Sequence, residues 1–141
     1  MIHVKFSKGY LDRNQQQVVN AGVAELGNEG SAPAYEKERI NWLVYESDER
    51  LIGALTADLL WDWIYIDELW VDADYRKRGT GKEMMSLAED YAVANNLTGL
   101  WLWTQSWQAA KFYEQLGYEE FTRFGDFPKG HYRIGFRKQV S

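Results

Sequence analysis

The sequence predicts an α/β protein whose mixed, mostly antiparallel sheet of about six to seven strands carries helices on both faces. Segments rich in β-forming residues dominate the second quarter and the end of the chain, and strand–helix–strand units occupy the middle, a pattern that favours helices packed on a mixed sheet. The chain has 141 residues, of which 45% are hydrophobic and 26% charged. We therefore expect one globular domain spanning residues 1–141.

The first predicted helix runs from Asp12 to about Leu26. Val19 and Val23 repeat with Leu26 at helical spacing, and Asp12 is suited to cap the N-terminus. Residues 27–33 are rich in Gly, Asn, Ser and Pro, so they are predicted to form a loop.

Six strands are predicted from β-forming residues bounded by turn residues. In chain order they are 40–46, 51–60, 63–71, 100–103, 118–124 and 131–138. The third strand contains an irregularity. Ile64 and Ile66 share one face, but Leu69 and Val71 look like the core residues further on, and these have the opposite parity. One extra residue in a β-bulge produces such a switch, although burial on both faces would also blur the alternation.

Two further helices follow the third and fourth strands. The first covers residues 81–94, with an apolar stripe at i, i+3, i+4 and i+7 formed by Met84, Leu87, Ala88 and Tyr91. The second has a stripe formed by Ala109, Phe112, Tyr113 and Leu116. We expect Ser106 to cap the start of this last helix and Gly117 to end it. Six tryptophans are expected to lie mostly in the core, with one or two beside a substrate: Trp61, Trp63, Trp70, Trp101, Trp103 and Trp107.

Charge is distributed unevenly along a chain of net charge -5. Between Leu51 and Tyr75 there are acids but no Lys or Arg; the acids are Asp58, Asp62, Asp67, Glu68, Asp72 and Asp74. Four basic residues then occur within seven positions: Arg76, Lys77, Arg78 and Lys82. The acidic stretch favours a cationic substrate, and the basic cluster indicates either an anion site or a solvated turn. The negative net charge argues against nucleic acid as a partner.

The segment from Arg76 to Lys82 lies between a predicted strand and a predicted helix. Gly79 and Gly81 allow the backbone to approach a ligand closely, and the free amides at a helix N-terminus attract phosphate. A Walker loop would need Ser or Thr after Lys82, where Glu83 stands, and a dinucleotide fingerprint would need an earlier glycine. Both of these readings therefore fail.

The run from Leu69 to Gly81 resembles the acetyl-CoA-binding motif of the GNAT acetyltransferases, Arg/Gln-x-x-Gly-x-Gly/Ala, which Arg76, Gly79 and Gly81 match. The run from Ala109 to Tyr118 resembles the second signature of that family, a helical Phe-Tyr followed by Gly and an aromatic residue. The resemblance implies the GNAT fold, with acetyl-CoA as cosubstrate and no metal. It implies cofactor contacts at Leu69, Trp70, Val71, Arg76, Lys77, Arg78, Gly79, Thr80, Gly81, Lys82, Ser106, Ala109 and Phe112.

The resemblance also implies catalytic roles. Tyr113 matches the tyrosine that protonates the leaving thiolate in this family, and its alternative role is that of a core aromatic. A carboxylate on the bulged strand would accept the proton of the amine, with Glu68 the first choice and Asp67 the second; the alternative for each is a solvated acid. The family often has Asn three residues before the helical Ala109, where this chain has Ser106.

The sequence therefore predicts an N-acetyltransferase acting on a primary amine of a small, cationic molecule by direct attack. A protein or peptide amine is a second version of this chemistry, and a non-catalytic acyl-CoA sensor is an alternative of another class. Cysteine is absent, and no apolar run reaches the roughly 20 residues that span a bilayer. We expect a cytoplasmic monomer or homodimer without membrane partners.

Overall fold

The computed structural model describes residues 1–141 and divides into two compact units, Met1–Tyr35 and Glu36–Ser141. The first unit contains helix α1 (Arg13–Glu29). Asp12 caps this helix as predicted, because its side chain accepts a 2.8 Å hydrogen bond from the Gln15 amide. The prediction that the following loop begins at residue 27 is wrong. The helix continues to Glu29, since a helical glycine costs only about 1 kcal/mol, and it ends at Gly30.

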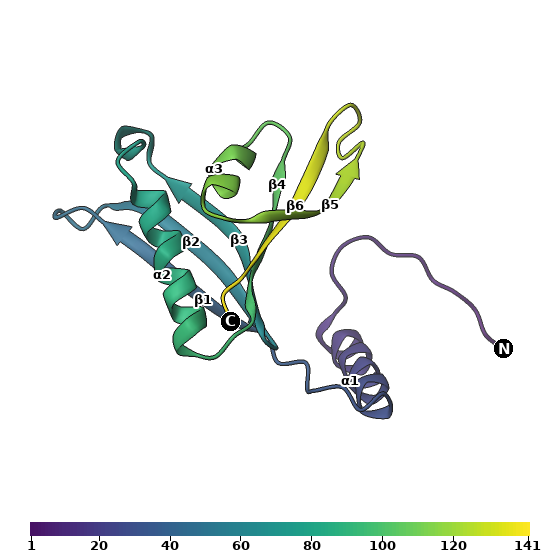
Figure 1. The fold of residues 1–141 in the computed structure, drawn as a ribbon. Coiled ribbons are helices and arrows are strands. Elements are labelled where there is room, and N and C mark those ends of the chain that lie inside the picture. Colours follow the sequence, from purple (N-terminus) through teal and green to yellow (C-terminus); the bar gives the residue numbers. More distant parts are fainter. The chain divides into compact units, whose positions relative to one another are not determined.

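The second unit is built on one six-stranded sheet, with the order β1-β2-β3-β4-β6-β5 (Figure 1). Its strands are β1 (Glu38–Tyr45), β2 (Leu51–Leu60), β3 (Trp63–Val71), β4 (Gly99–Gln105), β5 (Glu119–Gly125) and β6 (Tyr132–Gln139). Only β3 and β4 pair in parallel, and every other neighbouring pair is antiparallel. The predicted class, α/β with a mixed and mostly antiparallel sheet, is confirmed.

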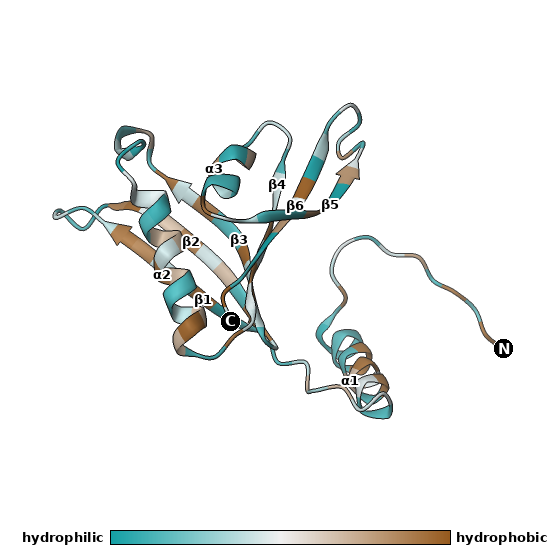
Figure 2. Ribbon diagram, in the orientation of Figure 1, coloured by the Kyte–Doolittle hydropathy of each residue, from teal (hydrophilic) through white to brown (hydrophobic).

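The second unit also contains a short 3₁₀ helix (Ala73–Tyr75), α2 (Thr80–Ala94) and α3 (Ala110–Gln115). Helices α2 and α3 lie on the same face of the sheet (Figure 2). They cover a core that includes strand residues such as Ile64, Leu102 and Phe136. None of the helices in the chain is long and apolar enough to cross a membrane.

The buried face of α2 differs from the predicted stripe by part of a turn. Met84 and Ala88 are buried as predicted, but Leu87 is 45% exposed and Met85 is fully buried. The helix is therefore rotated so that Met84 and Met85 both face the sheet. Tyr91 lies at the border of this face, where its ring contacts the Trp42 ring edge-on at 5.7 Å.

The start of α3 also differs from the prediction. Its N-cap is Ala109, which makes no side-chain capping bond, and Ser106 lies before the helix. Ser106 instead links β4 to β6, because its amide donates a 2.7 Å hydrogen bond to the Tyr132 carbonyl. The predicted stop is confirmed, since Gly117 follows the last turn with a φ of 91°.

The sheet face opposite α2 and α3 carries aromatic side chains. The Trp101 ring contacts Tyr65 at 4.5 Å, Trp103 at 6.4 Å and Phe121 at 6.2 Å between ring centres. The expectation that six of the tryptophans lie mostly in the core is wrong. None of these six is fully buried, because Trp63, Trp101 and Trp103 lie on this second face and Trp61, Trp70 and Trp107 lie at exposed positions.

Candidate active site

The site begins at a bulge in β3. On the neighbouring strand, Ala57 pairs with Ile66 and Thr56 pairs with Glu68, so Asp67 is an extra residue without a partner in the β2–β3 ladder. The predicted β-bulge between Ile66 and Leu69 is confirmed. Its consequence is that Asp67 and Glu68 are both exposed instead of alternating between the two faces.

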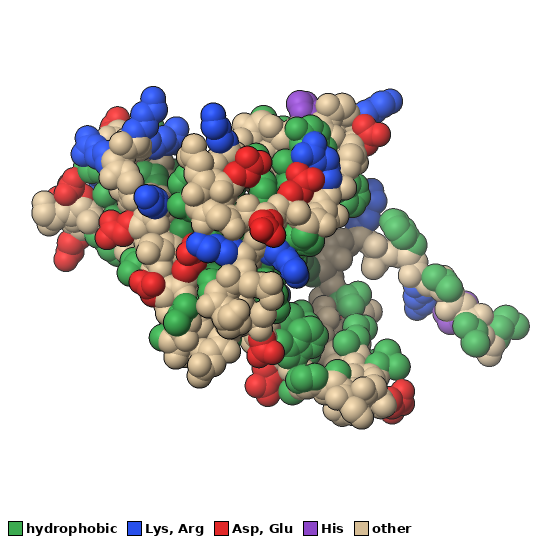
Figure 3. Space-filling model, viewed as in Figure 1, with side chains coloured by type: hydrophobic (Ala, Val, Ile, Leu, Met, Phe, Trp, Pro, Cys, Tyr) green, Lys and Arg blue, Asp and Glu red, His purple; other side chains and the backbone are tan.

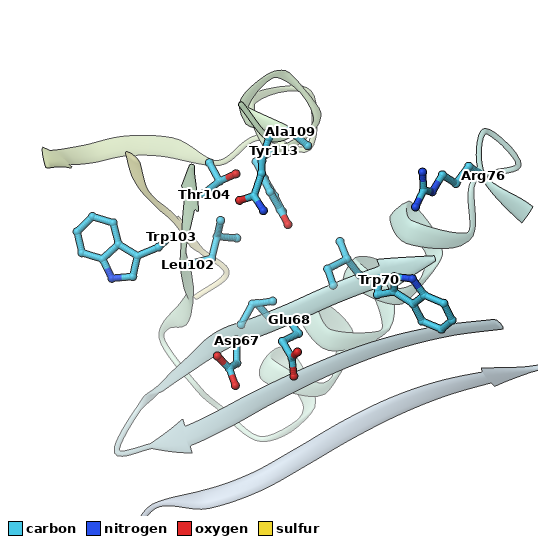
Figure 4. Close-up of a pocket in the computed structure, with 12 residues that line it drawn as sticks. Asp67, Glu68, Trp70, Arg76, Leu102, Trp103, Thr104, Ala109 and Tyr113 are labelled. Carbon is cyan, nitrogen blue, oxygen red and sulfur yellow. The ribbon is translucent and has the colours of Figure 1, made fainter. Parts of the chain in front are cut away.

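Beyond the bulge, β3 and β4 separate. Their parallel pairing covers only residues 63–66 and 99–102, and the ends of both strands beyond it border a cavity of about 740 Å³ (Figure 4). Its lining comes from β3, β4, the 3₁₀ segment and α3: Ile66, Asp67, Glu68, Leu69, Trp70, Arg76, Leu102, Trp103, Thr104, Gln108, Ala109 and Tyr113. We call this cavity the cleft. Both candidate bases and the candidate acid therefore line one space.

The basic loop adjoins the cleft at the start of α2. Gly79 is the N-cap residue with a φ of 82°, a left-handed conformation that glycine adopts without strain. The first amide bonded within the helix is that of Glu83, to the Gly79 carbonyl at 2.9 Å. The preceding amides of Thr80, Gly81 and Lys82 thus have no partner inside the helix. Lys and Arg side chains gather over this end of the second unit (Figure 3).

A second cavity of about 430 Å³ lies beside this loop. Its lining is Leu69, Val71, Tyr75, Arg76, Lys77, Gly79, Thr80, Gly81, Lys82, Ala109, Phe112 and Tyr113. We call it the loop pocket, and it shares Leu69, Arg76, Ala109 and Tyr113 with the cleft. The two cavities therefore meet at Tyr113, as one elongated ligand would require.

The loop pocket and the cleft together account for all but two of the predicted cofactor residues. The exceptions are Arg78, which lies over the Tyr75 ring at 5.2 Å, and Ser106, which is bonded to β6 as described above. Arg76 is fixed at the junction of the cavities, because its Nε donates a 3.1 Å hydrogen bond to the Val71 carbonyl.

Tyr113 combines the two roles that the sequence left open. It is only 9% exposed and packs against the rings of Phe112, Tyr118 and Phe136, so it belongs to the core. It also lines both cavities, and its hydroxyl points from α3 into the cleft (Figure 4). Burial raises the pKa of Tyr113 to about 12, and the phenol is therefore fully protonated at neutral pH.

The two candidate bases differ in their partners. Asp67 accepts a 3.1 Å hydrogen bond from the Arg39 guanidinium, which also binds Asp58 at 3.0 Å. Glu68 has no cation within ion-pairing distance and accepts one 3.1 Å hydrogen bond from the Thr56 hydroxyl. Asp67 is therefore held in an ion pair within the chain, whereas the Glu68 carboxylate stays available to meet the ammonium group of a substrate.

Sequence reasoning missed a network that supports the basic loop from the β1–β2 hairpin. The Tyr75 hydroxyl donates to Glu46 and accepts a 2.9 Å hydrogen bond from Arg50. The hydrogen bond to Glu46 raises the pKa of Tyr75, and the same bond lowers the pKa of Glu46. Thr104 and Gln108, which line the cleft, were also missed. Of these missed residues, only Tyr75 had a neighbour in the sequence, Arg76, that already indicated a functional segment.

The Acetyltransferase (GNAT) family model matches residues 12–118. The chain belongs to this family. Among curated relatives, the blasticidin-S acetyltransferase of Streptomyces morookaense is 34% identical over 92 residues, which are 63% of this chain and 68% of that one. This GNAT acetyltransferase therefore has a relative that acetylates blasticidin S.

Solved structures agree in fold. An acetyltransferase from Bacillus cereus superposes with a TM-score of 0.82 at 25% identity, covering 98% of this chain and 97% of that one. An acetyltransferase from Bacillus anthracis, solved in complex with acetyl coenzyme A, gives a TM-score of 0.66 at 24% identity, over 73% and 63% of the two chains. The resemblance to the GNAT family, which the sequence suggested from two short motifs, is thus confirmed by the similarity of the whole fold.

Proposed function

We propose that this GNAT acetyltransferase transfers an acetyl group from acetyl-CoA to the primary amine of a small molecule that is cationic in solution. The observation that carries the proposal is the meeting of the loop pocket and the cleft at Tyr113. A ligand lying through both cavities has its phosphates at the free amides of α2 and its acyl end beside Glu68 and Tyr113.

The residues of the loop pocket fit the cofactor. The amides of Thr80, Gly81 and Lys82 donate to the pyrophosphate, and the dipole of α2 adds partial positive charge there. A Cβ on Gly81 would lie 3.6 Å from the Phe112 ring, so the glycine leaves room for a ligand against that ring. Leu69 and Val71 on β3, beyond the bulge, pair with the pantetheine arm by main-chain hydrogen bonds.

The chemistry is a direct transfer without a covalent enzyme intermediate, as the absence of cysteine favours. Glu68, directly or through water, takes one proton from the ammonium, and the neutral amine attacks the thioester carbonyl. A main-chain amide at the bulge stabilises the oxyanion. The nitrogen then loses its second proton to water, the carbon–sulfur bond breaks, and the leaving thiolate takes up a proton from solvent, giving the amide and free CoA.

The pKa of Tyr113 refines its role in this last step. A phenol with a pKa of about 12 holds its proton more tightly than a thiolate whose conjugate acid has a pKa of roughly 8.5. Tyr113 therefore stabilises the thiolate mainly by donating a hydrogen bond while the bond to carbon breaks. Full proton transfer to sulfur follows as the products relax and solvent enters.

Two observations bear on the acceptor. A relative acts on blasticidin S, and Glu68 stands unpaired by any cation at the cleft. The acidic stretch is less negative than its sequence implies, since Arg39 on β1 pairs with Asp58 and Asp67, and Lys37, just before β1, pairs with Asp58. A protein or peptide amine is the second candidate for the acceptor.

Three further expectations stay predictions: a single domain over residues 1–141, a cytoplasmic location, and a monomeric or homodimeric state.

Calorimetry with acetyl-CoA, followed by a thiol-release assay over a panel of amines, tests the proposal. We expect micromolar binding, and turnover on small amines that exceeds turnover on peptides. Binding without turnover on any amine would favour the acyl-CoA sensor. Absence of binding would contradict the assignment of the loop pocket.

A further inference from the structure

Arg133 is a cation held between aromatic rings without an acidic partner. The centre of its guanidinium lies 3.8 Å from the ring centre of Trp103, 4.7 Å from that of Phe127 and 5.7 Å from that of Phe124. Its Nε is buried and has no hydrogen-bond partner. No carboxylate lies within 4.0 Å of it.

The Arg133 Nε is the one buried side-chain nitrogen or oxygen in the chain that has no hydrogen-bond partner. Arg39 and Arg123 both pair with acids, at 3.0 Å to Asp58 and 2.8 Å to Glu120. A charged donor left unpaired in a buried position destabilises the fold more than a neutral one does. The stacking on Trp103 offsets part of this cost and fixes the plane of the guanidinium. The result is a guanidinium of fixed orientation, whose terminal nitrogens have no acidic partner in the chain and can donate to an anion from outside it.

The position of Arg133 connects it to the cleft. It stands on β6, opposite Gln105 of β4 in the ladder, and it stacks on Trp103, which lines the cleft together with Asp67. Burial raises the pKa of Tyr65, the charge of Asp67 raises it further and the charge of Arg133 lowers it. Asp67 and Arg133 therefore both lie close to Tyr65, on the face of the sheet opposite α2.

We propose that Arg133 binds a carboxylate of the acceptor, so that the preferred acceptors are small amines that also carry a carboxylate. This inference rests on the proposed acetyl transfer and narrows its acceptor: the ammonium group is the cationic part of the molecule, and the carboxylate makes the whole molecule a zwitterion. The acceptor places its amine beside Glu68 and its carboxylate on the guanidinium, whose terminal nitrogens can donate two parallel hydrogen bonds. A phosphate group would bring a second negative charge towards Asp67 and Glu68, so a singly charged carboxylate suits the site better.

A binding experiment tests the site without relying on turnover. The ¹⁵Nε–¹Hε resonance of Arg133, assigned by its loss in Arg133→Lys, is followed with and without CoA during titration. The probes are N-acetylglycine, N-acetyl-β-alanine and N-acetyl-γ-aminobutyrate, each with its carboxamide as control. We expect a saturable shift with at least one carboxylate and none with its carboxamide. If no carboxylate moves the resonance more than its carboxamide does, the proposal is wrong.

A kinetic experiment tests the consequence for specificity. Amino acids and their carboxamides are compared as acceptors in the wild type, in Arg133→Met and in Arg133→Lys. In wild type we expect kcat/KM to favour the carboxylate by about tenfold or more, the size of effect that a hydrogen bond between charged groups gives. Arg133→Met should remove this preference through KM alone, and Arg133→Lys should restore part of it.

The matched control is Arg137→Met, because Arg137 lies on the same strand and face, 5.6 Å from the Trp63 ring centre, and should keep the preference. The proposal is overturned if Arg133→Met lowers kcat/KM equally for the carboxylate and the carboxamide of each pair and also lowers the unfolding temperature. Arg133 would then be a structural residue. If no amine releases thiol, the proposed acetyl transfer fails, and the resonance titration still decides whether Arg133 binds a carboxylate.

Discussion

The hydroxyl of Thr56 donates a 3.1 Å hydrogen bond to the carboxylate of Glu68, across the strand pair and at the position of the β3 bulge. This bond fixes the direction of Glu68 without neutralising its charge. The other acid of the bulge, Asp67, is held by Arg39 instead. The bulge therefore places two adjacent carboxylates at the cleft in different electrostatic states.

Replacing Glu68 with Gln tests its role as the base. We expect kcat/KM to fall by about a hundredfold, a typical effect for losing a general base, with the Kd for acetyl-CoA unchanged. Asp67→Asn is the matched control and should cost much less, because Asp67 is already paired with Arg39. Steady-state kinetics with calorimetry measures both, and equal losses in the two variants would contradict the assignment.

Replacing Tyr113 with Phe tests the stabilisation of the leaving thiolate. We expect kcat to fall by about tenfold to a hundredfold and affinity for acetyl-CoA to be kept. The ring contacts with Phe112 and Phe136 remain in the variant, so its unfolding temperature should stay close to that of wild type. Unchanged kcat in a folded variant would leave Tyr113 as a core residue only.

Substituting Gly81 tests the phosphate site. Gly81→Glu should abolish acetyl-CoA binding, because bulk and negative charge would stand beside the free amides of α2. Gly81→Ala is the control for the fold, since its Cβ would make only ordinary contacts, at 3.6 Å to Phe112 and 4.0 Å to Val71. We expect both variants to fold. Calorimetric affinity for the Glu variant equal to that of wild type would refute the loop assignment.

The sequence was sufficient for features that depend on local pattern. The limits of β3, the Asp12 cap, the Gly117 stop and the bulge follow from residue types within one segment, and the structure agrees with them. The anion site proposed at residues 76–82 could be predicted in the same way, because the glycines, the basic residues and the start of the helix follow one another in the sequence.

Features that depend on contacts between distant segments were not predictable. Arg39 and Asp67 are 28 residues apart and meet only because β1, β2 and β3 lie in register. The rotation of α2 that buries Met85 instead of Leu87 is set by its packing on the sheet. The unpaired state of Arg133 could not be seen either, since it depends on Trp103 and Phe127 from different segments.

Stability in alkaline solution provides a last prediction. Burial raises the pKa of Tyr113 to about 12, and burial also raises the pKa of Tyr118, with a further contribution from Glu89. In the unfolded chain a tyrosine ionises near pH 10. The unfolded state therefore loses these protons first, and the stabilisation that is complete below pH 10 declines as the pH rises towards 12.

In Tyr113→Phe this ionisation is absent, so the variant should lose less stability on going from pH 8 to pH 11, by about 1 kcal/mol. Urea unfolding at the two pH values measures the difference in the free energy of unfolding. Tyr45→Phe, at a tyrosine that is 55% exposed, is the matched control and should follow the wild type. If Tyr113→Phe loses as much stability as the wild type, the pKa of Tyr113 is not raised in the folded protein.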